Sequence, residues 1–113
     1  MENIMTEIDP QKAVDYLRDN AEKYAEAKAS RVYLEEFRKS KKSLLMLQSD
    51  EKTQAGKEAY AYAHDEYIAL LDGLKVAIET EETVKWQMIA AQARIEVWRT
   101  QQANNRNIVN STR

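Results

Sequence analysis

The sequence contains no cysteine, one proline, two glycines and one histidine among its 113 residues. Without cysteine the chain forms neither a disulfide framework nor a thiolate zinc site, and a reducing compartment suits it. The scarcity of proline and glycine leaves long stretches without a helix breaker. A di-iron bundle needs a Glu-x-x-His motif on each of two helices, so one histidine is too few. These absences favour continuous helix and argue against the common metal sites.

Long apolar runs and signal segments are also missing. No run approaches the ~20 apolar residues of a membrane-spanning helix. Residues 1–10 include three acids and lack the apolar segment of a secretion signal. No glycine-rich phosphate loop and no strand-turn-helix nucleophile motif is present. We therefore expect a cytoplasmic protein (the cytoplasm of a bacterial host if the gene is phage-derived) with no membrane contact, cofactor, metal or enzymatic activity.

The residues that are abundant, including Ala, Glu, Lys, Gln and Leu, favour helix because they lose little rotamer freedom in it. Asp9-Pro10 is typical of a helix start, since Asp accepts from free backbone donors and proline is tolerated at the first position. Residues 49–51 offer a second cap, and Asp65 after His64 offers a third. These signals predict one helical domain over residues 10–103, with helices at about 10–48, 51–63 and 65–103, an N-terminal extension 1–9 and a flexible tail 104–113.

Apolar residues recur at helical spacing in both long segments. The first series is Val14, Leu17, Ala21, Tyr24, Ala27, Leu34, Phe37, Leu44 and Leu45. The second series keeps a three-four alternation over four heptads and is Leu70, Leu74, Ala77, Glu81, Val84, Met88, Ala91, Ile95 and Trp98. Such a period is typical of helices that pack along their length. Trp86 lies off this second stripe, and Gly73 inside the helix is expected to be tolerated rather than required.

Charge alternates in blocks along the chain. Residues 2–26 hold three basic and seven acidic residues, and residues 28–42 hold six basic and two acidic. Residues 50–82 hold three basic and nine acidic residues, and residues 83–113 hold five basic and one acidic. Antiparallel pairing of the long helices sets opposite charges side by side, whereas parallel pairing sets like charges together. The sequence therefore predicts an all-α fold, a coiled-coil-like antiparallel hairpin of two long helices with a short middle helix, which completes a bundle by dimerisation.

Several basic residues are candidates for contacts with nucleic acid or with a protein partner. They are Arg31, Arg38, Lys41, Lys42, Arg99 and Arg106. Phosphate binding fits the dense run at residues 38–42. The alternative, which we favour, is that these charges pair across the hairpin with Glu79, Glu81, Glu82 and Asp72. His64 is interpreted as a residue of the joint between helices, and Trp98 as core.

Three stretches, residues 31–42, 59–64 and 97–106, together resemble small helical proteins of uncharacterised function that tailed bacteriophages and prophages encode, often near recombination or early-region genes. The resemblance implies a phage accessory that binds a phage or host protein. Our leading hypothesis is a non-enzymatic interaction protein that acts through helix-face contacts and forms a homodimer or higher homo-oligomer. The alternative is a nucleic-acid-binding accessory in phage recombination or replication.

Overall fold

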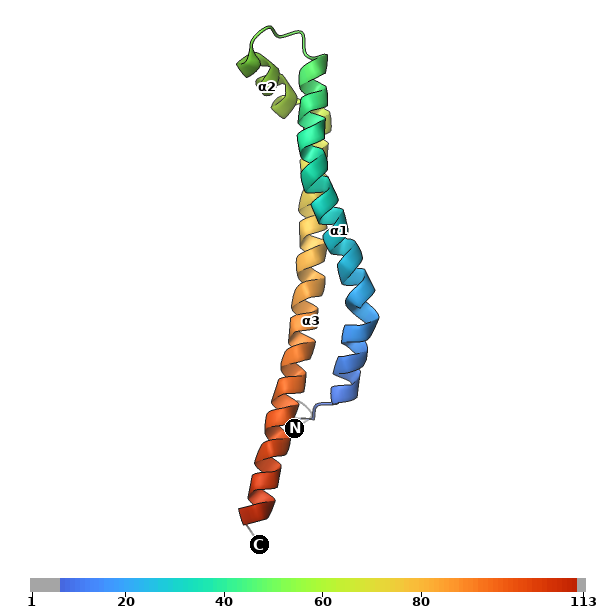
Figure 1. Ribbon diagram of the computed structural model, residues 1–113, viewed down its shortest axis with the longest axis vertical. Helices are drawn as coiled ribbons and strands as arrows, with labels where there is room; N and C mark the ends of the chain where they lie inside the picture. The colour runs from blue at the N-terminus through green and yellow to red at the C-terminus, as the bar shows by residue number, and fades with distance from the viewer. Residues whose placement is uncertain (1–6, 112–113) are drawn as a thin grey trace. The chain divides into compact units, whose positions relative to one another are not determined.

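The computed structural model describes residues 7–111, which form three helices (Figure 1). They are α1 (Pro10–Gln48), α2 (Gln54–Ala63) and α3 (Asp65–Ser111), and the described residues contain no strand. The predicted all-α fold with two long helices and a short middle helix is confirmed, while dimerisation stays a prediction. The first six residues of the expected N-terminal extension lie outside the described range.

Side-chain caps explain where α1 and α2 begin. The Asp9 carboxylate accepts hydrogen bonds from the backbone N–H groups of Gln11 (3.0 Å) and Lys12 (3.2 Å), which confirms the predicted start. The prediction for α2 was wrong by three residues. The Thr53 hydroxyl accepts from the N–H of Gly56 at 2.9 Å and is the true cap, whereas the Ser49 hydroxyl accepts from Glu51 at 3.0 Å and only shapes the connection.

His64 is the joint between α2 and α3, as predicted, but it also replaces Asp65 as the cap. Its backbone is extended, with φ −69° and ψ 139°, which ends α2. Its Nδ1 accepts a hydrogen bond from the N–H of Glu66 at 3.0 Å, a donor that the first turn of α3 leaves free. Asp65 is therefore the first residue of α3, where the helix dipole favours its negative charge.

The predicted end of the third helix near residue 103 was wrong, because α3 continues to Ser111. Asparagine is a weak helix former, but each one costs only a fraction of a kcal/mol, ~0.7 at most, and neither glycine nor proline interrupts residues 104–111. Extending an existing helix is far easier than starting one. The Ser111 hydroxyl also donates to the carbonyl of Asn107 at 2.9 Å.

The described chain divides into two units, which are treated separately. The second unit, Tyr24–Glu82, holds the later part of α1, all of α2 and the start of α3. Figure 1 shows α2 beside the C-terminal end of α1. Leu45 of α1, Ala61 of α2 and Tyr67 of α3 form its buried cluster, with Met46 packed against it. Helix α2 is thus held by an apolar contact with both long helices.

The first unit comprises the chain up to Lys23 and again from Thr83. Ala13 of α1 and Val84 and Ala91 of α3 are buried in it. The Tyr16 hydroxyl donates to Oε1 of Gln87 at 2.7 Å, and Lys12 and Arg94 line one cavity with these residues. In the second unit Arg31 contacts Glu81 and Lys41 contacts Glu66, so the two long helices run antiparallel there.

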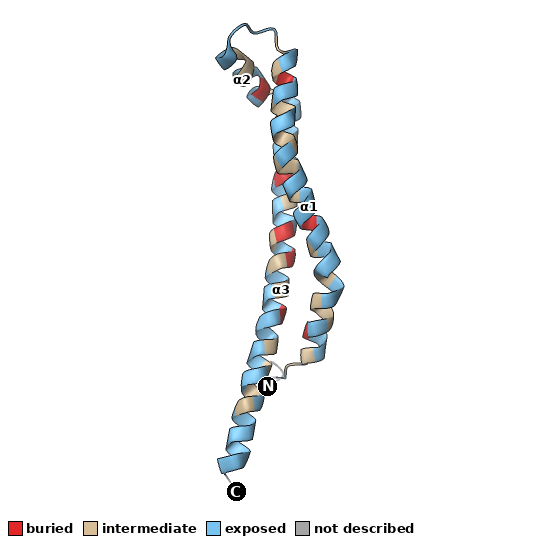
Figure 2. Ribbon diagram, viewed as in Figure 1, coloured by how far each residue is buried: buried red, intermediate tan, exposed pale blue. Residues whose placement is uncertain are grey.

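The predicted stripe of α3 is confirmed, since all nine of its residues are buried or half-buried. The predicted stripe of α1 was partly wrong, because Val14, Ala21 and Leu44 are exposed. The observed inner stripe keeps a strict four-three spacing, and polar side chains fill several of its positions. It consists of Ala13, Leu17, Asn20, Tyr24, Ala27, Arg31, Leu34, Arg38, Lys41 and Leu45. Figure 2 shows how few positions are buried on either long helix.

Gly73 is tolerated in α3 rather than required. A Cβ added there meets no atom within 4 Å, and no described glycine has positive φ. We expect Gly73→Ala to raise the free energy of unfolding by about 0.5–1 kcal/mol, because alanine loses less backbone entropy on folding. Urea unfolding measures this. Gly56→Ala is the matched control and should give no gain, since its Cβ would lie 3.0 Å from the Thr53 hydroxyl and 3.1 Å from Glu51.

Candidate functional site

Arg31 is held inside the second unit by two carboxylates. Its Nε and Nη2 donate to Glu81 at 2.6 and 3.1 Å, and its Nη1 donates to Glu35 at 3.0 Å. The Glu81 side chain is only 9% exposed, and that of Arg31 is 25% exposed. The hydrogen bonds to Glu81 are the main cause that raises the pKa of Arg31 above its ordinary value, and the hydrogen bond to Glu35 raises it further. A guanidinium with these partners has little capacity left for an external ligand.

Lys41 is also paired within the second unit. Its Nζ donates to the Glu66 carboxylate at the start of α3. This hydrogen bond is the main cause that lowers the pKa of Glu66 below its usual range, and the positive charge of Lys41 lowers it further. The prediction that basic residues of the first long helix pair with acids across the hairpin is confirmed for Arg31 with Glu81. Lys41 follows the same rule with Glu66, an acid that the prediction did not name.

Arg38 and Lys42 lie together at a cavity of about 540 Å³ in the second unit. Lys42 Nζ lies 4.7 Å from the centre of the Tyr62 ring and 3.7 Å from the Glu58 carboxylate. The interaction with the Tyr62 side chain, more than any other, raises the pKa of Lys42. Arg38 is half-buried and forms no ion pair with any residue in the range 7–111.

Arg99 and Arg106 belong to the first unit, on α3. Arg99 pairs with Glu96 at 3.1 Å on the helix surface, where both side chains are about two-thirds exposed. Arg106 is exposed and lines a shallow cavity of about 340 Å³ with neighbouring residues of the same helix. The structure therefore brings Arg31, Arg38, Lys41 and Lys42 into one unit and places Arg99 and Arg106 in the other. Trp98 is half-buried, in line with its predicted place on the stripe.

Two tyrosines and a serine at the cavity were missed by the reasoning from sequence. Tyr62, Tyr67 and Ser43 line it beside the basic residues of α1. The Tyr62 and Tyr67 rings pack edge to face with centroids 5.3 Å apart. The sequence did contain a signal, because Tyr62 and Tyr67 lie on either side of the joint at His64 between α2 and α3. Only the turn at His64, however, brings both rings against α1.

The described part of the chain meets neither the requirements of a metal site nor those of a membrane-spanning helix. Within residues 7–111 no group of three or more His, Asp or Glu side chains is placed to hold a metal ion. None of the described helices combines the length and the apolar character needed to cross a membrane. His64 uses its Nδ1 for the cap of α3, and its ring lies 5.6 Å from that of Tyr60.

Comparisons of the chain with protein-family models, with curated proteins and with solved structures find no match.

Proposed function

We propose that the protein is a non-enzymatic interaction protein that acts through the outer faces of its helices and that its first partner is a second copy of itself. The observation that carries this proposal is the balance of apolar surface. Among the described residues eight hydrophobic side chains are buried, four of them alanines, whereas sixteen large hydrophobic side chains are exposed. Exposed apolar side chains mark an interaction site where they gather into one patch, as part of this set does on α1.

Part of this surface forms a second stripe on α1, which we call the outer stripe. It consists of Tyr33, Phe37, Leu44 and Leu47, spaced by four, seven and three residues. Tyr33 is 65%, Leu44 50% and Leu47 83% exposed, and the Tyr33 and Phe37 rings stack with centroids 5.9 Å apart. A helix with an apolar stripe on two faces is suited to pack against two neighbours.

A second copy fits the outer stripe because a two-fold axis pairs the same patch on both subunits. Each copy then offers aromatic and leucine side chains, which are the residue types that fill helix-helix contacts. The resemblance to small phage proteins supports a role as an accessory whose assembled form binds a phage or host protein. Most candidate basic residues of α1 have acidic partners within the chain, which also favours protein contacts over nucleic acid.

We expect light scattering after size exclusion to give a homodimer or larger homo-oligomer. Replacing Tyr33 and Leu47 together by lysine should raise the dissociation constant at least tenfold, because two charged side chains would then be buried without partners in the contact. The circular dichroism spectrum of this double variant should remain that of a helical protein. Val76→Lys is the matched control, since Val76 is 61% exposed on α3 in the same unit but lies off the outer stripe.

Two outcomes would overturn this proposal: a wild-type protein that stays monomeric at high concentration, or a Val76→Lys variant that dissociates as readily as the double variant.

The alternative function, nucleic-acid binding, has one observation in its favour. Arg106 is exposed and forms no ion pair with the rest of the described chain. Anisotropy titration with single- and double-stranded DNA at two salt concentrations tests it, and affinity that falls steeply with salt would favour this alternative.

A further inference from the structure

The cavity of about 540 Å³ in the second unit is lined by cationic and hydroxyl side chains from all three helices. Four of them come from α1, one from α2 and one from α3. They are Arg38, Lys39, Lys42, Ser43, Tyr62 and Tyr67. Its size falls in the range of small-molecule sites, roughly 300–1,000 Å³. The joint at His64 and the buried cluster around Leu45 hold the three helices together at this point.

Positive charge at the cavity exceeds what neighbouring carboxylates neutralise. Arg38 has no ion-pair partner in the described range. Lys39 pairs only with Glu36, at 3.3 Å, and both side chains are more than two-thirds exposed, so water screens the pair. Lys42 meets Glu58 at 3.7 Å, which is too long for a strong charged hydrogen bond. An incoming anion would meet one unpaired guanidinium and two weakly held ammonium groups.

The Tyr67 hydroxyl adds a donor that is fixed in place. Tyr67 is 7% exposed, and its ring is packed by the buried cluster and by Tyr62. Its hydroxyl nevertheless forms no hydrogen bond with any residue of the range 7–111, while the residue lines the cavity. Since no buried side-chain oxygen in the range 7–111 lacks a hydrogen-bond partner, this unpartnered oxygen itself reaches solvent at the cavity although the ring is buried. The hydroxyl is therefore available to an acceptor in the cavity.

We propose that this cavity binds the phosphate group of a small phosphorylated molecule, a phosphate monoester. Arg38 supplies the planar fork of donors that matches two phosphate oxygens, and Lys42 and Lys39 supply further charge. The hydroxyls of Tyr67 and Ser43 donate to the remaining oxygen. A monoester carries close to two negative charges at neutral pH, which suits a site with three cations better than a single carboxylate does.

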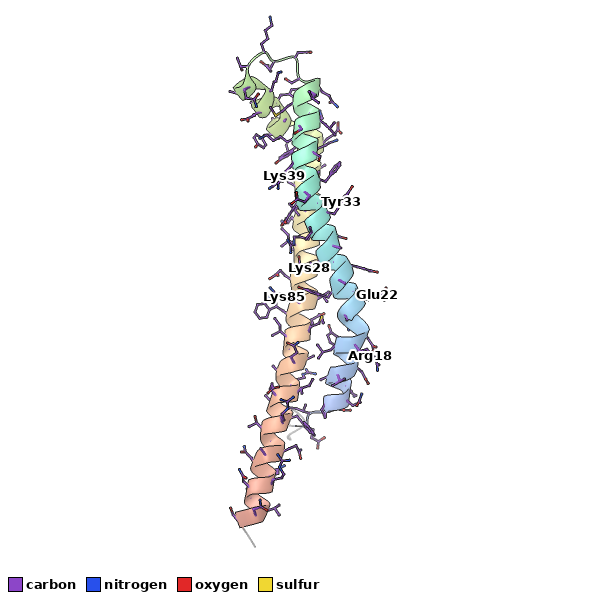
Figure 3. All side chains as sticks on the ribbon, in the orientation of Figure 1. Arg18, Glu22, Lys28, Tyr33, Lys39 and Lys85 are labelled. Carbon is purple, nitrogen blue, oxygen red and sulfur yellow. The ribbon has the colours of Figure 1, made fainter. Side chains whose placement is uncertain are left out.

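The surroundings favour one isolated phosphate over a nucleic-acid backbone. The next cations along the inner stripe, Arg31 and Lys41, are engaged by Glu81 and Glu66. No continuous line of open cations therefore extends from the cavity along α1. A backbone contact needs such a line to hold successive phosphates. This inference is independent of the outer stripe, because Tyr33 and Lys39 point to different sides of α1 (Figure 3).

The test is a titration of the full chain, followed by amide chemical shifts, with inorganic phosphate and with phenyl phosphate at constant ionic strength set by chloride. We expect saturable shifts confined to residues 38–43 and 60–67, with a dissociation constant on the order of 1 mM for inorganic phosphate and tighter binding of phenyl phosphate. Arg38→Gln should weaken binding about tenfold or more, because it removes charged hydrogen bonds. Tyr67→Phe should weaken it several-fold while the helical spectrum stays unchanged.

Lys28→Gln is the matched control. Lys28, labelled in Figure 3, is an exposed cation of α1 in the same unit. It is not among the residues that line the cavity. Its removal should leave the dissociation constant within twofold of wild type. The proposal fails if neither phosphate gives saturable shifts up to tens of millimolar, or if Lys28→Gln weakens binding as much as Arg38→Gln. A DNA oligonucleotide without terminal phosphates that shifts the same residues at lower concentration would replace the small-molecule assignment by a backbone contact.

Discussion

Leu45→Ala should lower the free energy of unfolding by about 2–5 kcal/mol. Leu45 is the one large side chain with no exposed surface in the range 7–111. It packs between Ala61 of α2 and Tyr67 of α3, so its truncation leaves a cavity that two short or rigid neighbours fill poorly. In a protein with a core of eight buried hydrophobic residues in the described range, such a loss is a large part of the total.

Urea unfolding followed by circular dichroism measures the effect of Leu45→Ala. Leu71→Ala is the matched control, because Leu71 is 38% exposed in the same unit and its truncation should cost no more than about 1 kcal/mol. Amide hydrogen exchange adds a second readout. Residues 54–63 should lose protection in Leu45→Ala first, since α2 depends on this contact. Equal effects of the two leucine variants would contradict the role given to the cluster.

The second large effect is expected at the Arg31–Glu81 pair. Arg31→Leu and Glu81→Leu should each lower the urea midpoint clearly, because the first removes the two-point partner of the nearly buried Glu81 carboxylate and the second leaves the Arg31 guanidinium with Glu35 as its carboxylate partner. The double variant should recover most of the loss, since two leucines on facing inner stripes pack against one another. Buried ion pairs are often no more stabilising than apolar pairs of similar volume, yet breaking one is costly.

A double-mutant cycle in urea measures the coupling between these two residues. Lys39→Gln serves as the control for an exposed pair, and it should leave the midpoint within error of wild type, because both Lys39 and Glu36 are mostly exposed. If Arg31→Leu and Glu81→Leu are additive, the pair contributes nothing specific. A coupled pair on the inner stripes would instead favour the antiparallel register, since a shift of either helix separates the charges.

Periodicity predicted α3 better than α1, and the reason is chemical. The stripe of α3 is apolar except for Glu81, so counting apolar residues finds it. On α1 the inner stripe passes through Asn20, Arg31 and Lys41, and long cationic side chains cover apolar neighbours with their methylene stems. A prediction that considers apolar residues alone therefore selects neighbouring positions such as Val14 and Leu44, which are exposed.

The candidate site was predicted only in part. The density of cations at residues 38–42 pointed to the right segment, but the sequence does not reveal which of them acids of the same chain neutralise. Arg31 and Lys41 are engaged, whereas Arg38 is open. The contribution of Tyr67 depends on the turn at His64, which is a tertiary feature. Charge blocks nevertheless predicted the antiparallel sense, because their signs repeat over many residues.

The contacts between the long helices differ in how much chain they enclose. The Lys41–Glu66 contact spans 25 residues, the Arg31–Glu81 contact 50 and the Tyr16–Gln87 contact 71. Closing a short loop loses less entropy than closing a long one, so the first of these contacts is the easiest to form from an unfolded chain. Each later contact then closes a segment already shortened by the one before it. We therefore expect contacts between α1 and α3 to form first next to α2 and then progressively farther from it. Because the first contacts are close in sequence, folding should be fast.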